Sequence, residues 1–444
     1  MQDPEDAPSA VDEVARICAD LLRIESVNYG DGSGPGERKA AEYVMDQLTE
    51  VGLEPVLLES DPGRASVLLR LEGSDPSRPG LAVHGHLDVV PANAADWQVH
   101  PFSAEERDGC IWGRGAVDMK DMDAMIIANL RHLGRTGEKP SRNTTFAFFA
   151  DEEAGGLKGS HWVVDAHRDW FAGVTEAISE VGGFSVTVPR AGTQEPARAY
   201  LVQTAEKGIV WLRLHAQGRA GHGSVPNDAN AIVRLSEAIN RIATYAWPRE
   251  YVASVAALLD GLSDLTGTPY TREDPTPLLR HLGPAAKFVL GTLSETATFT
   301  MLDAGYKHNV IPQTASASLD CRFLPGHEED LIGTVRQLAG EHVEVEVHHR
   351  DIALDAPLTG DLITAMTQSL LAEDPDATVL PYCLSAGTDN KALSRLGIAG
   401  YGFAPLRLPP DLDFAPMFHG IDERVPIESL QFGTRVLGHF LQRA

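Results

Sequence analysis

Hydrophobic positions in the first two hundred residues alternate between two spacings. Apolar side chains recur at the spacing of a helix in three segments, 11–24, 38–51 and 121–134, the last ended by glycine. Short apolar runs typical of strands occupy four others, 65–71, 81–84, 144–150 and 176–179. Strands that alternate with helices in this way predict an α/β domain whose sheet carries helices on both faces.

The pattern changes near residue 205. A run of strand type then occupies 209–216, and two alternating runs occupy 314–323 and 342–348, with a helix expected between them. Helical spacing occupies about 229–246. The segment 247–300 is rich in Pro, Gly, Thr and Leu, and we interpret it as an insertion.

Helical spacing resumes at 360–372 and 427–442, so the α/β character returns towards the end of the chain. A chain of 444 residues exceeds the size at which a single hydrophobic core stops growing, which favours two domains. We therefore expect a large domain formed by 1–204 and 351–444, with a small α+β domain over 205–350 inserted into it.

Composition and charge narrow the class of protein. Hydrophobic residues make up 43% and charged residues 23% of the chain, as in soluble globular proteins. The 63 acidic residues outnumber the 37 basic ones, and the net charge of -26 repels phosphate, so nucleic acid is a poor partner. No apolar run reaches the roughly 18 residues of a membrane span. The acidic, polar start, MQDPEDAPSA, is typical of neither a secretory signal nor a transit peptide, so we expect a cytoplasmic location.

The stretch 81–91, LAVHGHLDVVP, is the most informative part of the sequence. An apolar strand ends there at His86, and Asp88 follows two residues later. Side chains at the carboxyl ends of strands in open α/β sheets face the usual binding crevice. A neutral imidazole is a good zinc ligand, and a nearby carboxylate can hold its other ring nitrogen. The alternative is that His84 and His86 are ordinary core or surface histidines.

Two acidic motifs follow along the chain. In GRGAVDMK (113–120), Asp118 ends a glycine-containing turn just before a helix, where a lone carboxylate is more often an N-cap. The partial GxG is not a dinucleotide fingerprint, because the third glycine is missing and no strand leads in. In AFFADEEAGG, Asp151, Glu152 and Glu153 follow an apolar strand. Like charges repel, and a bound cation relieves the repulsion, although a solvated acidic turn is the alternative.

Two further side chains complete a candidate metal site. Glu180 closes an apolar strand in EAISEVGGF, and His419 lies in a proline-containing loop, APMFHGI. Each is weak evidence on its own, because a single histidine in a loop is usually just a polar residue. Together, two histidines and three carboxylates are what two zinc ions need if one carboxylate bridges them.

These motifs resemble the zinc aminoacylase and carboxypeptidase family, which includes acetylornithine deacetylase, succinyl-diaminopimelate desuccinylase, aminoacylase and glutamate carboxypeptidase. The match runs in family order over nearly the whole chain, through GHLDVVP, Trp97, Pro101, Phe102, GRGAVDMK and DEEAGG. The resemblance implies a catalytic domain with an open mixed sheet and an inserted lid or dimerisation domain. It also implies a homodimer formed through the inserted domain.

The resemblance assigns two zinc ions to five side chains. His86 and Glu180 would hold one ion, and Glu153 and His419 the other. Asp118 would bridge the two ions. Cobalt or manganese could replace zinc, because both affinity and availability decide which metal is bound.

The resemblance also implies catalytic roles beside the metals. Asp88 would orient the histidine that precedes it. Glu152 would be the general base that takes a proton from the metal-bridging water and passes it to the leaving nitrogen. A glutamate at position 180 is similar to deacylases and carboxypeptidases, whereas aminopeptidases tend to have aspartate. The peptide bond from Asp118 to Met119 is expected to be cis, as it often is in relatives.

Further counterparts would contact the substrate. His222, in GRAGHGSVP, would reach into the neighbouring subunit's site and polarise the scissile carbonyl. Asn309 and Arg322 would hold the substrate carboxylate, which a guanidinium grips with two hydrogen bonds. The alternative for Arg322 is a surface arginine on a strand. Gly387 and Thr388, in SAGTDN, would line the pocket.

One position departs from the family pattern. Asp121 stands where relatives usually have glycine, and we interpret it as a charge in the first turn of a helix.

We therefore expect a metal-dependent hydrolase that cleaves the amide bond of N-acyl amino acids or of short peptides with a free carboxylate. A dipeptidase or carboxypeptidase proper is the alternative within this class, because either substrate would place its carboxylate on Arg322. A catalytically silent metal-binding scaffold is the alternative from another class, and the intact Glu152 speaks against it. A serine hydrolase is disfavoured because the chain lacks a GxSxG motif.

Overall fold

A mixed sheet of ten strands forms the centre of the large domain in the computed structural model, which describes residues 8–444. Eight strands form a continuous path, in the order β1 (Val56–Asp61), β2 (Arg64–Leu71), β6 (Thr144–Phe149), β3 (Gly80–His86), β7 (Val174–Ser179), β18 (Ala399–Gly402), β9 (Ala197–Glu206) and β16 (Leu354–Asp355). Two more, β8 (Phe184–Val188) and β17 (Thr378–Leu384), also pair with β9. The neighbours β6, β3, β7 and β18 are parallel, whereas β1 and β2 are antiparallel. The predicted α/β class with an open mixed sheet is confirmed.

Alternate side chains of the middle strands enter two separate cores. In β3, Leu81 and Val83 belong to one core and Ala82 to the other, as the two-residue period of a strand requires. The helices that pack on the first core include α1 (Ala10–Leu22), α3 (Lys120–Thr136) and α12 (Ile427–Arg443). Two shorter helices supply the second: α4 (Ser160–Ala166) and α11 (Asn390–Ser394). Because both faces are covered, the middle strands are continuous apolar runs and not alternating ones.

The helices predicted from the apolar spacing are confirmed to within three residues at each end. The remaining two in the large domain are α2 (Arg38–Thr49) and α10 (Asp361–Glu373). The end of α3 differs slightly from the expectation, because the helix continues through Gly134. It stops at Gly137, whose φ of 73° lies in the left-handed region that glycine tolerates best.

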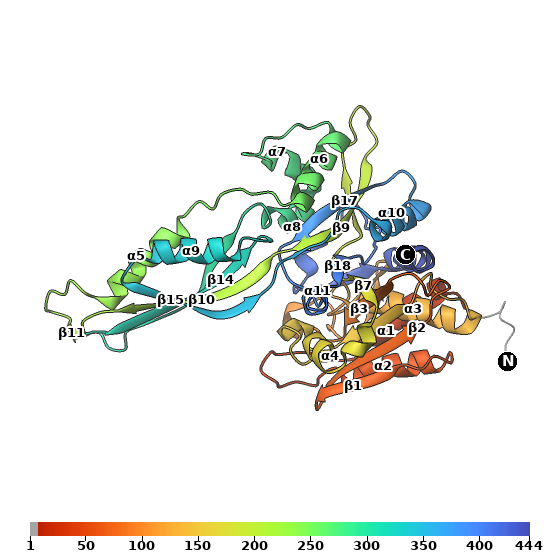
Figure 1. The fold of residues 1–444 in the computed structure, drawn as a ribbon, viewed down its shortest axis with the longest axis horizontal. Coiled ribbons are helices and arrows are strands. Elements are labelled where there is room, and N and C mark those ends of the chain that lie inside the picture. The colour runs from red at the N-terminus through yellow and green to blue at the C-terminus, as the bar shows by residue number, and fades with distance from the viewer. Residues whose placement is uncertain (1–7) are drawn as a thin grey trace.

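The small domain is an arm that extends away from the large domain (Figure 1). Its antiparallel sheet has the order β12 (Thr296–Ala304), β14 (Thr314–Phe323), β10 (Gly208–Gln217) and β15 (Val343–Asp351). The buried side chains of this sheet pack on α5 (Ala231–Ala243) and α9 (Glu328–Ala339) and form a core of their own. At the far end of the arm, β11 (Gly221–His222) pairs with β13 (Val310–Ile311).

One residue joins the two sheets on the outgoing path of the chain. β9 of the large sheet ends at Glu206, and β10 of the arm begins at Gly208. Lys207 between them is buried, and its Nζ donates hydrogen bonds to the carbonyl oxygens of Gly291 (2.9 Å) and Ser294 (2.7 Å). The junction is therefore tied to the segment that we interpreted as an insertion.

That segment contains three helices, α6 (Ala253–Thr266), α7 (Thr276–Leu279) and α8 (Ala286–Leu290). Helices α6 and α8 contact β17, and α6 and α7 lie at the top of Figure 1. The buried face of α6 consists of Val255, Leu258, Leu259 and Leu262, at the spacing of one helix face. These side chains belong to the core of the large domain and not to the core of the arm. Part of the range 205–350 thus packs on the large sheet.

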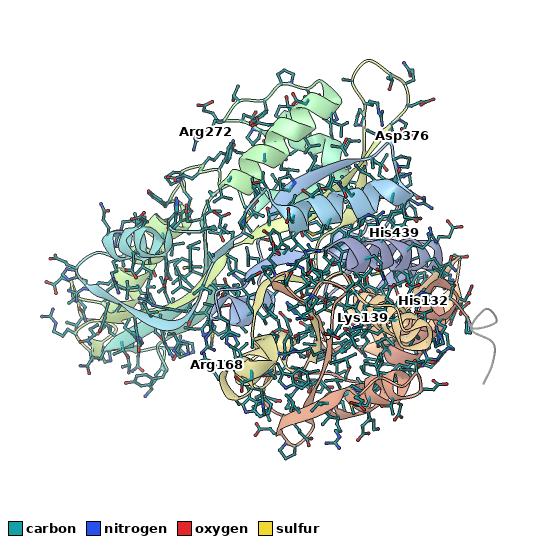
Figure 2. The ribbon with its side chains drawn as sticks, turned by 45° about the vertical axis from the view of Figure 1, so that its right-hand side comes forward. His132, Lys139, Arg168, Arg272, Asp376 and His439 are labelled. Atoms are coloured by element: carbon teal, nitrogen blue, oxygen red, sulfur yellow. The ribbon has the colours of Figure 1, made fainter. Side chains whose placement is uncertain are left out.

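A separate sheet of three short strands is formed by β4 (Glu105–Arg107), β5 (Cys110–Trp112) and β19 (Arg424–Pro426). It brings the chain around 423 next to the turn that follows β5. Charged side chains such as Lys139, Arg272 and Asp376 lie exposed on the outside of the molecule (Figure 2). Between residues 8 and 444, no helix is both long enough and apolar enough to cross a membrane.

Candidate metal centre

The carboxyl ends of three parallel strands deliver side chains to one edge of the large sheet. β3 ends at His86, β6 is followed by the acidic run that includes Glu152 and Glu153, and β7 is followed by Glu180. Parallel strands present their carboxyl ends at the same edge, so residues that are distant in sequence meet there. Two loops, which carry Asp118 and His419, complete the arrangement.

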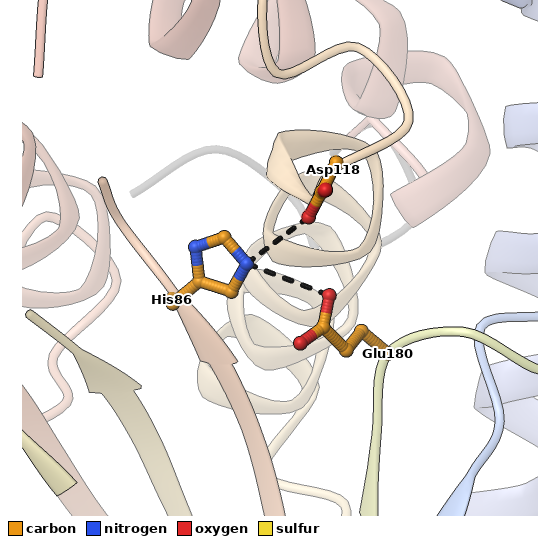
Figure 3. A group of neighbouring side chains, drawn as sticks. All are labelled: His86, Asp118 and Glu180. Carbon is orange, nitrogen blue, oxygen red and sulfur yellow. Dashed lines mark hydrogen bonds and ion pairs between the residues drawn. The ribbon is translucent and has the colours of Figure 1, made fainter. Parts of the chain in front are cut away.

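Two groups of ligand-type side chains form at this edge and share one carboxylate. In the first group, His86 Nε2 lies 3.2 Å from Asp118 Oδ1 and 3.4 Å from Glu180 Oε2 (Figure 3). In the second, His419 Nε2 lies 3.1 Å from Asp118 Oδ2 and 3.0 Å from Glu153 Oε2. The ligand atoms of each group lie within 4.8 Å of one another. Asp118 therefore presents one oxygen to each histidine, as a carboxylate that bridges two cations would.

The charge in this volume fits a pair of divalent cations. Two imidazoles, of His86 and His419, lie at this edge of the sheet together with four carboxyl groups, those of Asp118, Glu152, Glu153 and Glu180. Burial raises the pKa of Glu180 to about 8, because the charged form loses its hydration. Glu153 Oε1 is buried and has no hydrogen-bond partner among the described residues. Buried carboxylates need compensating positive charge, and oxygen and imidazole nitrogen are suitable zinc ligands.

Hydrogen bonding assigns the tautomer of His86. Its Nδ1 lies 3.0 Å from the backbone carbonyl oxygen of Asp88, and a carbonyl oxygen can only accept a hydrogen bond. The proton of a neutral imidazole is therefore on Nδ1, which leaves the Nε2 lone pair directed at the carboxylates. In the metal-free protein, hydrogen bonds to Asp118 and Glu153 raise the pKa of His419 to about 10. A metal ion at that position must displace this proton.

Asp88 organises the glutamates as well as the histidine. Its carboxylate accepts hydrogen bonds from the backbone N–H groups of Glu152 and Glu153, both at 3.1 Å. The side chain of Asn28 donates to the same carboxylate at 2.9 Å. Asp88 Oδ1 also lies 3.5 Å from His86 Nδ1. One buried carboxylate thus links the end of β3 to the turn after β6.

Glu152 lies beside the cluster without belonging to either ligand group. Its Oε2 is 3.9 Å from His86 Nε2, farther than the oxygens of the two groups. Burial, and then the nearby carboxylate of Glu180, raise the pKa of Glu152 well above its usual range. Asp151, which precedes it, has a φ of 67°, an uncommon conformation for a residue other than glycine. After this turn, Glu152 points towards His86 and Glu153 points towards His419.

The loop of Asp118 is held by a residue that the sequence did not indicate. Buried Glu423 accepts hydrogen bonds from the backbone N–H groups of Gly115 (3.0 Å), Val117 (2.8 Å) and Asp118 (3.2 Å). It also pairs with Arg114 Nη1 at 2.6 Å. The peptide bond that follows Asp118 is cis, as expected. Neither Glu423 nor Asn28 lies in a motif, so only the three-dimensional contacts reveal them.

His222 and Asn309 lie far from this cluster, at the tip of the arm (Figure 1). His222 is on β11 opposite Val310, and the Gly223 N–H donates to the Asn309 carbonyl oxygen at 2.9 Å. The His222 side chain is exposed, and its Nδ1 lies 2.8 Å from Ser224 Oγ. The structure thus brings these two residues together but not to the cluster of their own chain.

The other three candidate substrate contacts lie near the base of the arm. Arg322 on β14 makes a two-pronged ion pair with Asp320, at 2.6 and 3.0 Å. Thr388 donates from its Oγ1 to Glu206 at 2.6 Å, and Gly387 lies against the Lys391 side chain. Within a single chain, Nε and Nη2 of Arg322 are therefore already occupied.

Comparison with known proteins decides the family. A profile of the peptidase family M20/M25/M40 matches residues 82–443, which is most of the chain. The chain belongs to this family. The N-fatty-acyl-amino acid synthase/hydrolase PM20D1 of Xenopus tropicalis is 27% identical over 92% of this chain and 81% of its own length. Human aminoacylase-1 is 26% identical over 91% of this chain and 88% of its own length.

A solved structure supports the fold independently. The M20 family metallo-carboxypeptidase Sso-CP2 from Sulfolobus solfataricus superimposes with a TM-score of 0.72 at 18% identity and covers 97% of this chain and 99% of its own. Membership of the M20/M25/M40 family confirms the resemblance to the zinc aminoacylase and carboxypeptidase family. It also confirms the expected enzyme class, a metal-dependent amidohydrolase.

Asp121, the departure from the family pattern, lies in the first turn of α3 as predicted. It is buried, however, and burial raises the pKa of its carboxyl to about 8. Its position in the first turn is thus as expected, but burial disfavours the charged form that the interpretation assumes.

Proposed function

We propose that this M20 family member hydrolyses the amide bond of N-acyl amino acids or of short peptides with a free carboxylate. The observation that carries the proposal is Asp118, whose two oxygens each face a histidine that also contacts a glutamate. We assign two zinc ions to these side chains, with cobalt or manganese as substitutes: His86, Asp118, Glu153, Glu180 and His419.

When bound, such a metal pair polarises the scissile carbonyl and makes a water molecule more acidic. Glu152 is the general base in this proposal, because it is the one glutamate at the cluster outside both ligand groups. Its carboxylate accepts the proton of the attacking water and then donates it to the leaving nitrogen. Asp88 positions Glu152 through its backbone N–H and holds the tautomer of His86. The two proton transfers need the Glu152 carboxylate to be fixed within hydrogen-bond reach of the reacting atoms.

The arm supplies the groups that the cluster lacks. We propose that His222 enters the site of a second copy of the chain and donates a hydrogen bond to the oxyanion, so that the active form is a homodimer. Its exposure, and its separation from the cluster of its own chain, support this role. Asn309, which would enter with His222 from the second copy, and Arg322, at the base of the arm of the chain that supplies the candidate ligands, would together hold the substrate carboxylate. Arg322 must then share or exchange its contact with Asp320.

Gly387 and Thr388 line the substrate pocket in this proposal. Their position after β17, at the junction with the arm, supports a place between the two domains. A cytoplasmic location stays a prediction from the sequence.

A dipeptidase or carboxypeptidase proper is the second candidate function, and the likeness to a metallo-carboxypeptidase favours it. PM20D1 and aminoacylase-1 favour N-acyl amino acids. A panel of N-acetyl and N-succinyl amino acids and dipeptides, assayed with zinc- and cobalt-loaded protein, distinguishes the two. Faster turnover of dipeptides over the whole panel would support the peptidase.

The decisive experiment for the mechanism is Glu152→Gln, assayed together with metal content. Glutamine keeps the size of the side chain but accepts no proton, so we expect metal to stay bound while kcat falls by a factor of about 100 to 10,000. Glu106→Gln, on the exposed strand β4, is the matched control and should leave kcat unchanged. Retention of more than about a tenth of the rate by Glu152→Gln would exclude Glu152 as the general base.

A further inference from the structure

A buried lysine lies where the arm joins the large domain. Lys391 belongs to α11, which lies at the base of the arm (Figure 1), and its side chain is almost completely buried. Its Nζ donates a hydrogen bond to the carbonyl oxygen of Lys207 at 3.1 Å and lies 3.0 Å from Asp351 Oδ2. Lys207 is on the outgoing connection to the arm, and Asp351 ends β15 on the returning one. One ammonium group therefore contacts both connections between the two domains.

The contact with Asp351 reaches the part of the arm that carries Arg322. Ile209 of β10 is paired with Asp351 of β15 on one side and with Arg322 of β14 on the other. Paired side chains of neighbouring strands lie on the same face of a sheet, about 5 Å apart. These three half-buried residues therefore form one row across the sheet. A contact that fixes Asp351 also fixes Arg322, the residue to which we assigned the substrate carboxylate.

The start of α11 is bonded to the strand that carries His86. Asn390, the first residue of α11, is fully buried, and its Oδ1 accepts a hydrogen bond from His84 Nε2 at 2.9 Å. His84 lies two residues before His86 at the end of β3. Lys391 follows Asn390 directly in the chain. A short path of covalent bonds and hydrogen bonds therefore leads from a candidate metal ligand to the row of the arm sheet that contains Asp351.

The loop before α11 strengthens this connection. Thr388 donates from its backbone N–H (3.2 Å) and from its Oγ1 (2.6 Å) to the carboxylate of Glu206, which ends β9. The Asn390 N–H donates in turn to Thr388 Oγ1 at 3.2 Å. A Cβ on Gly387 would lie 2.8 Å from Lys391 Nζ, so glycine leaves room for the ammonium group. Buried polar networks of this kind make the parts that they join rigid when their members are paired.

We propose that Lys391 is a positioning residue that sets the orientation of the arm, and with it the place of Arg322, relative to the metal centre. Its ammonium group holds both arm connections from a helix whose start is anchored to β3. A guanidinium grips a carboxylate with two hydrogen bonds of fixed geometry, so a small displacement of Arg322 weakens the grip. The preference for substrates with a free carboxylate therefore depends on Lys391. The inference rests on the proposed function, because the amide hydrolase gives Arg322 a carboxylate to bind.

Lys391→Met tests the proposal, because methionine fills a similar space and offers no ammonium group. The contact between the substrate carboxylate and Arg322 forms on binding and persists in the transition state, so its loss raises KM and leaves kcat nearly unchanged. With the best-hydrolysed N-acyl amino acid of the panel, we expect KM to rise at least about tenfold while kcat changes by less than about threefold. Metal content should stay that of the wild type. An unchanged KM, or a fall in kcat alone, would overturn the proposal.

Lys139→Met is the matched control, because it makes the same substitution at an exposed lysine whose ion pair with Glu72, at 2.8 Å, lies on the surface. It should leave KM and kcat unchanged. Asp351→Asn breaks the same contact from the side of the arm and replaces Lys391→Met if that variant folds poorly, as thermal melting would show. The double variant should be no worse than Lys391→Met, because both changes act on one contact. Independent, additive increases in KM would contradict the shared contact.

Backbone hydrogen exchange distinguishes failure of this inference from failure of the proposed function. At the junction, the N–H groups of Lys207 and Ala356 donate to carbonyl oxygens at 2.9 and 2.8 Å, which protects them from exchange. We expect Lys391→Met to speed exchange in peptides that cover 206–210 and 351–356 at least about tenfold, and Lys139→Met to have no effect. Unchanged exchange would refute the positioning role even in an active enzyme. If exchange responded as expected but the wild type hydrolysed no substrate, the proposed function would be wrong and the role of Lys391 at the junction would stand.

Discussion

The candidate metal centre and the tip of the arm are opposite kinds of site. At the metal centre, four of the five ligand-type side chains are buried or half-buried and His419 is exposed, and every one of them contacts another. At the tip, His222 and Asn309 are exposed, and the recorded side-chain partner of His222 is the neighbouring Ser224. One chain thus preorganises the metal-binding half of the proposed site. The half that faces the substrate depends on a second copy or on movement of the arm.

The largest effect is expected from removing Asp118, the carboxylate that the two ligand groups share, because the metal-binding half of the proposed site depends on it. Asp118→Ala takes an oxygen from each group at once, so we expect the protein to retain neither metal ion and to lose activity by about a thousandfold or more. Metal analysis after gel filtration measures the first effect. Asp108→Ala, an exposed aspartate, is the control and should keep full metal content. Full metal content in Asp118→Ala would contradict the bridging role.

The tip should respond differently, because in the proposed mechanism His222 contributes to catalysis without holding metal. We expect His222→Ala to keep its metal and to lower kcat by a factor of about 100 to 1,000, as loss of an oxyanion donor does. Mixing this variant with Glu152→Gln should restore activity, because a mixed dimer contains one site with both residues intact. Random exchange of subunits would return up to about a quarter of the wild-type rate. No restoration after verified exchange would place His222 outside a shared site.

The smallest expected effect comes from Glu423, which supports the metal centre from outside. Glu423→Gln weakens the contacts with Arg114 and with the backbone before Asp118, so the loop is held less firmly. We expect metal affinity to fall about 10- to 100-fold, with kcat nearly normal at saturating metal. Titration with a zinc chelator measures the affinity, and Glu428→Gln on α12 serves as the control. Unchanged affinity would show that the loop holds its shape without this residue.

The candidate ligands could be predicted from the sequence better than the residues that hold them in place, because the end of an apolar strand can be recognised from the hydrophobic pattern. His86, Glu153 and Glu180 each follow an apolar run, and the structure brings them together with Asp118 and His419. Their role as ligands stays a prediction. Glu423 acts on a turn more than 300 residues earlier in the chain, and such contacts have no period that a sequence could show.

The segment 247–300 shows that the sequence can predict a helix without predicting what the helix packs on. Val255, Leu258, Leu259 and Leu262 have helical spacing, so α6 could have been predicted from the pattern. Their partner could not, because an apolar stripe shows that one face is buried without showing what covers it. The structure supplies that partner, which is β17 of the large sheet. The contacts among the rings of Phe184, Phe288, Phe414 and Phe418 could not be predicted for the same reason, since these rings come from three distant segments.

The single-residue junction at Lys207 makes the arm a lever. Strand β10 runs outwards from this point for ten residues, a length of about 33 Å at the usual rise of a strand. A rotation of about 10° around the junction would therefore displace the far end of β10 by roughly 6 Å. The Lys207 ammonium is anchored to the carbonyl oxygens of Gly291 and Ser294, so this point is held by the segment between α8 and β12. A swing of the arm would therefore turn about a point that is held by this buried ammonium group.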